Sequence, residues 1–376
     1  MGCVECKYCR HEEDKNQFEY PTNSKRKIEN SLEKSVPNIP NDKFFEEFEE
    51  KLKDIGKYIS KEDFVKIIPE EAFQIMKDDP FKIQVKNENI HEIKPVEFEN
   101  GNIYYGNWND NYEMEGYGQY YLKEENVMAE GIWDKGELKE GRIFFPNGDI
   151  YEGEMSDSVY NGRGKLITQN KDEYIGEFVN GEKNGKGTMK FADDQTEYCG
   201  NFSNSNFNGE GNMKWINGIE YKGNFHDNYL EGKGILFNKD GEKYEGNFEK
   251  SFFYGNGKYT YSNGDEYEGN FEYGIKKGKG VYRKKDGLIY EGMWDNNIPN
   301  GHGKIIINKD VLKCNFHNGK IIGEIVSENG PYTGDIDYNF FLEPVNLSPQ
   351  MLSHLENENF SSSQYRAGTL PSFLED

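Results

Sequence analysis

The chain has 376 residues, a net charge of −23 at pH 7 and a mean hydropathy of −0.95. This acidic balance argues against nucleic-acid binding and against broad electrostatic adhesion to anionic lipid. No stretch approaches the roughly 20 apolar residues of a membrane-spanning helix, and we expect no secretory leader. Three of the five cysteines fall in the first nine residues, which fits a reducing cytosol better than a disulfide framework.

The chain begins with Met1-Gly2-Cys3 and has a second cysteine at Cys6. A glycine exposed by removal of the first Met is the acceptor for N-myristoylation, and a neighbouring cysteine is a candidate for palmitoylation. The stretch resembles the acylated N-termini of Src-family kinases, which implies myristate on Gly2 and palmitate on Cys3. Cys6 stands where the general motif has Ser or Thr, and it is a further palmitoylation candidate. Because one myristoyl chain binds membranes only marginally, the second acyl chain would give the stable anchor.

Two other interpretations of residues 1–40 stay open. Cys3, Cys6, Cys9 and His11 offer three sulfurs and an imidazole at short spacing, which is also the ligand chemistry of a zinc site. An unmodified disordered tail also fits this polar terminus. We favour the acylated tail, because a terminal tetrad without a structured loop around it would make an unusual zinc site. The sequence therefore predicts no metal and no cofactor.

Residues 41–80 have the pattern of short helices. Apolar residues recur at helical spacing after the candidate cap Asp42: Phe44, Phe48, Leu52, Ile55 and Ile59. Ser60 with Asp63 resembles a capping box for a second helix, and Pro69 could open a third. These helices would either cover the first edge of the sheet predicted below or form a separate docking element. Residues 81–100 would be a linker or leading cap.

One short phrase then recurs along the chain: an aromatic residue, any residue, glycine, any residue and a bulky apolar residue. It starts at Tyr104, Ala129, Tyr151, Tyr174, Tyr198, Tyr221, Tyr244, Tyr267, Tyr290, Leu312 and Tyr332, at intervals of 20 to 25 residues. A nearly fixed period of this size is typical of a stacked-unit architecture rather than of a globular catalytic domain.

Each unit predicts a β-hairpin. In residues 221–225 (Tyr-Lys-Gly-Asn-Phe), alternation places Tyr, Gly and Phe on one face of a strand. A glycine pair such as Gly232 and Gly234 follows, with an apolar residue two positions further on, which indicates a second half-buried strand. Dipeptides such as Asn217-Gly218 accept the positive φ angles of tight turns. Hairpins must stack to bury a continuous core, and we expect the glycines to leave room for aromatic rings.

These residues resemble the MORN (membrane occupation and recognition nexus) repeat family, whose pattern is Tyr-x-Gly-x-Trp/Phe, a Gly-x-Gly pair and an Asn-Gly or Asp-Gly turn. The resemblance covers residues 101–336, about 10–11 units. It implies an all-β fold, an elongated array of stacked β-hairpins preceded by a short α-helical segment. MORN arrays are known to dimerise, so a homodimer is a candidate assembly. We interpret Ala129, which replaces an aromatic, as a local irregularity, and Cys314, which replaces a glycine, as the start of a C-terminal cap.

Two surfaces of the array are candidate binding sites. The first is the aromatic face, which we expect to be turned toward a protein partner: Tyr174, Phe178, Tyr221, Phe225, Tyr244, Phe248, Tyr267, Phe271, Tyr290 and Trp294. The second is a basic run in an array that has 27 Lys and Arg against 39 Asp and Glu: Lys276, Lys277, Lys279, Arg283, Lys284 and Lys285. We interpret this run as a candidate phosphoinositide site, with a solvated hairpin face as the alternative.

No catalytic constellation is recognised in the sequence, and no glycine pair extends to a phosphate-binding loop. We therefore predict a non-enzymatic, acyl-anchored scaffold at the cytoplasmic face of a plasma or ciliary membrane, which binds a protein partner through the array. The alternative is a structural subunit of a ciliary, axonemal or cytoskeletal assembly. A regulatory subunit of a phosphoinositide-modifying enzyme is a weaker third. Residues 337–376 are expected to be a flexible tail or partner-docking peptide with one short helix.

Overall fold

The structure is a computed structural model that describes residues 42–81, 90–193, 195–327, 345 and 347. The chain divides into two compact units, Met1–Lys57 and Tyr58–Asp376. In the first unit lie helix α1 (Asp42–Ile55) and the start of strand β1 (Gly56–Tyr58). On α1, Phe48 and Leu52 are buried one helical turn apart, as their spacing predicts. No helix among the described residues is long and apolar enough to span a bilayer.

The second unit begins with two short helices, α2 (Lys61–Ile67) and α3 (Glu70–Asp78). Ser60 caps α2, because its Oγ accepts a hydrogen bond from the Asp63 amide at 3.0 Å. Pro69 stands directly before α3 and supplies the φ angle that suits a helix start. The predicted helical segment is therefore confirmed, with its second and third helices starting where the sequence signals place them.

Helices α2 and α3 cover one face of the first strands of the sheet, not its edge. The four buried residues of these helices are Phe64, Ile68, Ala72 and Met76, and they pack against Ile103, Tyr121, Met128 and Phe144. These four sheet residues are apolar, whereas the corresponding outward positions of most later units carry charged side chains. Helices α2 and α3 therefore pack on the first units because the outer face of the sheet is apolar there.

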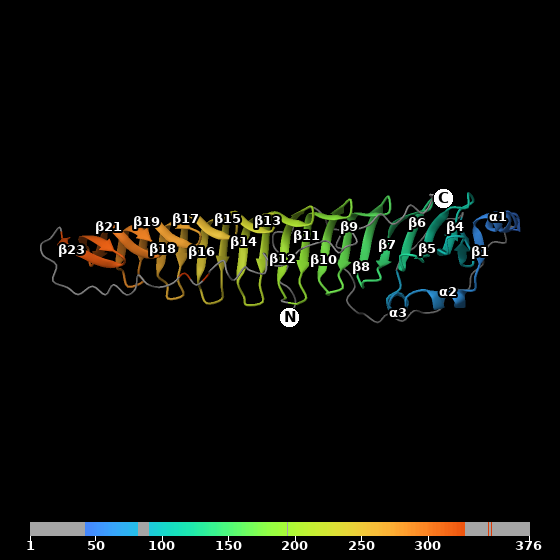
Figure 1. Ribbon diagram of the computed structural model, residues 1–376, viewed down its shortest axis with the longest axis horizontal. Helices are drawn as coiled ribbons and strands as arrows, with labels where there is room; N and C mark the ends of the chain where they lie inside the picture. Colours follow the sequence, from blue (N-terminus) through green and yellow to red (C-terminus); the bar gives the residue numbers. More distant parts are fainter. Residues whose placement is uncertain (1–41, 82–89, 194, 328–344, 346, 348–376) are drawn as a thin grey trace, which may run out of the picture. The chain divides into compact units, whose positions relative to one another are not determined.

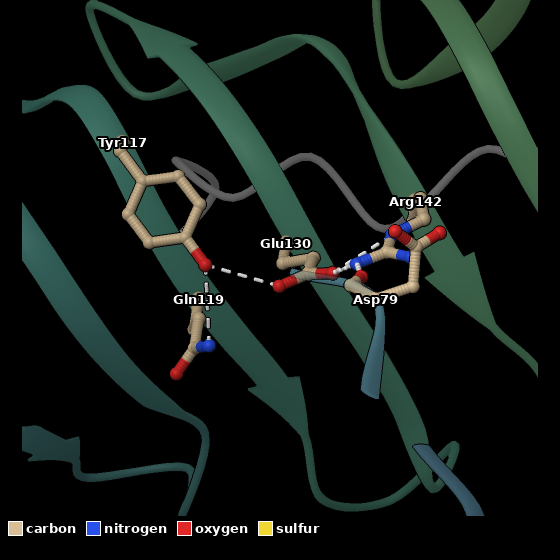
Figure 2. A network of polar contacts seen from close by, with 5 residues as sticks. All are labelled: Asp79, Tyr117, Gln119, Glu130 and Arg142. Atoms are coloured by element: carbon tan, nitrogen blue, oxygen red, sulfur yellow. Dashed lines mark hydrogen bonds and ion pairs between the residues drawn. The ribbon is translucent and has the colours of Figure 1, made fainter. Parts of the chain in front are cut away.

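A buried ion pair fastens the end of α3 to the same face (Figure 2). Arg142 Nε donates to Glu130 Oε1 at 2.8 Å, and Arg142 Nη2 donates both to this oxygen and, at 2.6 Å, to the carbonyl of Asp79. Tyr117 donates to the other oxygen of Glu130 at 3.0 Å, and Gln119 donates to the Tyr117 hydroxyl at 3.3 Å. Both charged side chains are buried, so each depends on the other for its hydrogen bonds.

The rest of the second unit is an antiparallel sheet whose strands follow one another in chain order (Figure 1). The strands of the first half are β2 (His91–Glu92), β3 (Val96–Phe98), β4 (Ile103–Trp108), β5 (Met114–Leu122), β6 (Val127–Asp134), β7 (Glu137–Phe144), β8 (Ile150–Ser156), β9 (Val159–Ile167), β10 (Glu173–Val179), β11 (Glu182–Lys190) and β12 (Glu197–Ser203). The strands of the second half are β13 (Asn206–Lys214), β14 (Glu220–His226), β15 (Tyr229–Phe237), β16 (Lys243–Glu249), β17 (Phe252–Thr260), β18 (Glu266–Glu272), β19 (Ile275–Arg283), β20 (Ile289–Asp295), β21 (Ile298–Ile307), β22 (Asp310–His317) and β23 (Lys320–Ser327).

Both β2 and β3 pair with β4, and from there each strand pairs with the next as far as β23. The register places glycine opposite glycine at every step: Gly211 faces Gly223, which faces Gly234, which faces Gly246. This row of glycines crosses the sheet from Gly106 to Gly303, where its next partner is Cys314. The predicted all-β array of stacked hairpins is confirmed.

Five Asn-Gly or Asp-Gly dipeptides, which begin at residues 147, 217, 240, 263 and 286, connect one hairpin to the next. In the first such turn, Gly148 has a φ of 90° and its amide donates to the carbonyl of Phe145 at 3.0 Å. Asn147 keeps a negative φ, and its side chain accepts the Asp149 amide at 3.0 Å. Only the glycine of the dipeptide therefore needs the left-handed conformation, and the Asn acts through its side chain.

Most turns inside the units have two successive positive φ angles, at residue pairs that vary from unit to unit. Lys250 and Ser251 have φ angles of 47° and 66°, as a type I′ turn requires. The strain is offset by contacts with the preceding unit: the Ser251 amide donates to the Leu230 carbonyl at 2.9 Å, and Ser251 Oγ accepts the Leu230 amide at 3.1 Å. Asn228 and Asn297 make the corresponding pair of bonds with Phe207 and Lys276.

The two irregular units form ordinary hairpins. At Ala129, where the ring is missing, Leu138 approaches the glycine pair and takes its place. At Leu312, where the ring is also missing, the side chain of Cys314 fits where other units need glycine. Cys314 thus lies inside the hairpin β22–β23, and the array does not end there. Burial raises the pKa of its thiol to about 11, so this cysteine is a weak nucleophile at neutral pH.

Candidate functional site

The signature tyrosine of each unit lies across the unit's own glycine pair. A Cβ added at Gly223 or Gly234 would meet atoms of the Tyr221 ring at 2.3–2.7 Å. The Tyr221 hydroxyl reaches past the glycines and donates to the carbonyl of Asn224 at 2.9 Å. The same bond, from the tyrosine to the carbonyl three residues on, recurs at Tyr104, Tyr151, Tyr174, Tyr198, Tyr244, Tyr267 and Tyr290. The glycines therefore make room for a ring that ties down the strand.

The rings also join one unit to the next. The Tyr244 ring lies edge-on to Phe248 of its own unit, with centroids 5.1 Å apart, and to Phe271 of the next unit at 5.2 Å. The ten predicted aromatic residues are each 2% exposed or less: Tyr174, Phe178, Tyr221, Phe225, Tyr244, Phe248, Tyr267, Phe271, Tyr290 and Trp294. These side chains are the core of the array, so the expectation that they face a partner is wrong. A single sheet becomes a folded domain because these rings fill the space between its units.

On the opposite face of the sheet, positive and negative side chains alternate from strand to strand. Lys165 pairs with Glu173 at 2.6 Å, and Lys258 pairs with Glu266 at 2.7 Å. Lys304 pairs with Glu291 at the same distance of 2.7 Å. Such cross-strand pairs at the surface each contribute little to stability, but they keep the outer face polar and electrically balanced.

The predicted basic run is divided by the alternation of strand β19. Lys277 pairs with Glu272 at 2.5 Å and Arg283 pairs with Glu268 at 3.2 Å, both within the charge-balanced face. Lys284 pairs with Asp286 at 3.0 Å in the following turn, while Lys279 and Lys285 are exposed. Lys276 points to the other face and is 0% exposed, so it does not belong to a surface patch. The candidate phosphoinositide site thus loses Lys276, and acidic neighbours pair with three of the other five residues.

Lys276 occupies a cage of aromatic rings inside the array. Its Nζ donates to the Tyr261 hydroxyl at 2.8 Å and lies 4.8 Å from the ring centroid of Trp294. The rings of Tyr261, Tyr267 and Tyr282 lie 5.4–5.8 Å from the same nitrogen. A buried ammonium is stabilised by the negative faces of such rings. The equivalent positions of the three preceding units hold Phe207, Leu230 and Phe253.

Beside this cage, Tyr259 and Tyr282 stand at an inward position that most other units fill with an aliphatic residue or methionine, and that Tyr120 holds in the first unit. The Tyr282 hydroxyl donates to Asp265 Oδ2 at 2.7 Å, and the Tyr259 hydroxyl donates to Glu242 Oε1 at 3.3 Å. Both carboxylates are buried. We call Glu242, Tyr259, Tyr261, Asp265, Lys276 and Tyr282 the polar cluster. In the polar cluster, polar residues from three successive units lie together, and several of them occupy positions that are apolar in neighbouring units.

A family model of the MORN repeat matches seven consecutive segments: residues 151–173, 174–196, 198–219, 221–243, 244–266, 267–289 and 290–308. Residues 151–308 are MORN repeats. The hairpins β4–β5, β6–β7 and β22–β23 lie outside the matched segments but continue the same sheet and glycine row. MORN repeats are a non-catalytic repeat type, and the comparison indicates no enzyme family.

Solved structures with a likeness to this chain include two centriolar protein domains. The TCP10c domain of Drosophila melanogaster Sas-4 is 13% identical with a TM-score of 0.23, and the match covers 44% of this chain and 90% of that one. The TCP10 domain of Danio rerio CPAP is 14% identical with a TM-score of 0.17, covering 62% and 88%. Similarity at this level carries nothing about the function of the MORN array. A comparison with curated proteins gives no match.

Sequence reasoning missed the polar cluster, although the MORN repeats themselves contain the signal. When the units are aligned with one another, Lys276 stands where Phe253 and Leu230 stand, and Tyr259 stands where Leu236 and Met213 stand. A polar residue at a position that is apolar in the neighbouring units marks a local role. The predicted lipidation residues Gly2, Cys3 and Cys6 lie outside the described residues, as does the repeat start at Tyr332.

A second, half-buried lysine on the inward face of the MORN array predicts a pH-dependent stability. Lys183 lies at the position equivalent to Lys276, 5.3 Å from the Tyr174 ring centroid and 3.8 Å from Met189 Sδ, and desolvation lowers its pKa to about 8. Because the unfolded chain holds this proton up to about pH 10.5, stability rises as pH increases from about 8 to 10.5. We expect Lys183→Met to raise the Tm at pH 7 by about 2–4 °C, with a smaller gain at pH 10. Differential scanning fluorimetry measures both values.

The control for this prediction is Lys186→Met, which removes an exposed lysine from the same strand. It should change the Tm at neither pH, since an exposed ammonium is hydrated in both the folded and unfolded states. An equal gain from Lys183→Met at pH 7 and pH 10 would contradict the assignment of the effect to the buried ammonium.

Proposed function

We propose that this chain is a non-enzymatic MORN-repeat scaffold, held at the cytoplasmic face of a membrane by acyl groups on Gly2 and Cys3, that binds a protein partner through its array. The observation that supports the scaffold role is the burial of the signature tyrosines, phenylalanines and glycines. These residues hold the units together. Outward positions can therefore vary without loss of the framework, and they are the ones left to recognise a partner.

An exposed group of aromatic residues is the part of the array best suited to such a contact. Tyr273, in the turn between β18 and β19, is 60% exposed, and Tyr254 on β17 is 39% exposed. The Tyr273 ring lies edge-on to Phe252 at 6.0 Å and to Tyr254 at 6.1 Å. Exposed tyrosines that already contact one another lose little conformational entropy on binding, and aromatic residues are enriched in protein interfaces.

The membrane part of the proposal rests on Gly2 and Cys3, because the array itself offers no concentrated positive charge. The ion pairs of Lys277 and Arg283 on β19 and the net charge of −23 leave little attraction to anionic headgroups. An acyl chain inserts regardless of the charge of the domain that carries it, at about 0.8 kcal/mol for each buried methylene. Two chains would therefore outweigh the repulsion of an acidic array.

We expect Gly2→Ala to move the full-length chain from the membrane fraction to the soluble fraction. Cys3→Ser should give partial release, because myristate alone binds only marginally. Val4→Ala is the matched control and should fractionate as the wild type does. The measurement is an immunoblot of fractions prepared with and without detergent. The anchor is excluded if Gly2→Ala stays with the membranes, and wild-type protein that resists detergent release would favour the cytoskeletal subunit instead.

A further inference from the structure

Leu347 lies against the polar cluster, 88 residues away in sequence from the tyrosine that it contacts. Its backbone amide donates to the Tyr259 hydroxyl at 3.2 Å. The residue is 1% exposed, although it lies well beyond the end of β23 at Ser327. Val345, two residues earlier, is half-buried. A segment from the C-terminal part of the chain therefore reaches back to the middle of the array.

The Tyr259 hydroxyl is oriented to accept this amide. A phenol has one proton, and that of Tyr259 is directed to Glu242 Oε1 at 3.3 Å. Its oxygen accepts the hydrogen bond from the Leu347 amide. Glu242 is itself held by Asn238, whose Nδ2 donates to Glu242 Oε2 at 2.9 Å. The chain Asn238–Glu242–Tyr259 thus fixes an acceptor on the inward face of β17.

A hydroxyl occurs at this position in three units of the described array, at Tyr120, Tyr259 and Tyr282, and that of Tyr120 accepts a hydrogen bond from Asn102 at 3.3 Å. The equivalent residues of the three preceding units are Met189, Met213 and Leu236, which cannot accept an amide hydrogen bond. Tyr282 of the following unit has a hydroxyl, but it donates at 2.7 Å to Asp265, and the Leu347 amide contacts Tyr259 instead. The hydrogen bond to Tyr259 therefore fixes one position for the Leu347 segment along the repeats of the array.

The sequence around Leu347 suits binding as a non-helical peptide. Pro344 and Pro349 flank it, and proline disfavours the helical conformation in the residue before it, here Glu343 and Ser348. Leu347 itself lies at a bend and is buried, and Val345 is half-buried. Two prolines also reduce the conformational entropy that the segment loses on docking.

We propose that the inward face at Tyr259 is a docking site for a leucine-containing peptide, and that its occupant is the segment of this same chain around Leu347. Recognition combines the backbone hydrogen bond to Tyr259 with burial of the leucine side chain. The bond fixes the register, and the buried leucine supplies most of the affinity. The inference does not depend on membrane anchoring, since it rests only on the array and Leu347.

Hydrogen–deuterium exchange of the full-length chain tests this proposal. The Leu347 amide should be protected in the wild type, and Tyr259→Phe should raise its exchange rate about tenfold, because the acceptor is lost while the ring remains. Tyr282→Phe is the matched control, which removes a hydroxyl from the same position of the next unit and should leave Leu347 protected. Amides of β14 and β15 report whether each variant is still folded. Free exchange at Leu347 in the wild type, or equal protection in both folded variants, would overturn the proposal.

A second arm identifies the occupant. Leu347→Asp should free the site in the full-length chain, and a synthetic peptide of residues 343–351 should then bind in trans, but not to the double variant Tyr259→Phe/Leu347→Asp. Fluorescence anisotropy of the labelled peptide measures both. Protection of Leu347 that is independent of protein concentration supports docking within one chain. Protection that disappears on dilution would show that the occupant belongs to a second copy, against the proposal.

Discussion

Gly234→Ala is expected to lower the free energy of unfolding by about 3 kcal/mol, a large effect for one methyl group. The added Cβ would lie 2.5 Å from two atoms of the Tyr221 ring, and this ring is fully buried between neighbouring units. To make room, Tyr221 would have to leave its bond to the Asn224 carbonyl and its contact with Phe248. Urea unfolding monitored by tyrosine fluorescence gives the size of the loss.

Gly232→Asn is the control for this change, two residues away on the same strand. Gly232 has a φ of 66°, a conformation that Asn tolerates, and an added Cβ would meet no atom within 4 Å. This substitution should cost less than about 1 kcal/mol. Equal losses in the two variants would mean that backbone conformation, and not the space under the tyrosine ring, explains the glycines of the repeat.

Arg142→Met is expected to destabilise the first units by about 3–5 kcal/mol, because it leaves the carboxylate of Glu130 buried without its cation. Glu130 is 1% exposed, and the hydrogen bond from Tyr117 cannot replace the bonds that Arg142 donates (Figure 2). The bond to the Asp79 carbonyl is lost as well, so the end of α3 loses its attachment to the sheet. Hydrogen exchange of α3 and β5–β7 should rise, while exchange of β14–β15 should not.

The double variant Glu130→Met/Arg142→Met separates the ion pair from simple packing. With both charges removed, two flexible apolar side chains fill the space and no charge is left unpaired, so stability should return to within about 1 kcal/mol of the wild type. A double variant as unstable as Arg142→Met alone would show that the geometry of the arginine, and not the stranded carboxylate, holds α3 in place.

The sequence was most informative where a residue acts within its own unit. Tyr221, Gly223 and Gly234 meet inside one hairpin, so the repeat pattern alone predicted both the strands and the space for the ring. The turn at Lys250 and Ser251 was not recognisable, because Ser251 is held in a left-handed conformation by Leu230 of the preceding unit. Contacts between units determine this backbone conformation, and they cannot be recognised from the sequence of one unit.

In the candidate site too, contacts within a unit could be predicted from the sequence, whereas contacts between units could not. Lys276 was grouped with Lys277 and Lys279 as adjacent charges, but alternation along β19 sends it to the opposite face, where the Tyr261 hydroxyl and aromatic rings from three strands contact its amino group. The docking of Leu347 on Tyr259 joins residues 88 positions apart and leaves no periodic sign in either segment. The aromatic residues were correctly placed on one face, but their burial depended on the fit between neighbouring units.

The central claim, that a rigid MORN array is carried to a membrane by its N-terminus, is tested most directly by intact mass spectrometry of the protein isolated from its native cells. The account predicts loss of Met1, a myristoyl group on Gly2, and a palmitoyl group on Cys3 that hydroxylamine releases. A native protein whose first residues carry no acyl group would contradict the membrane anchor and leave the array as a structural component without one.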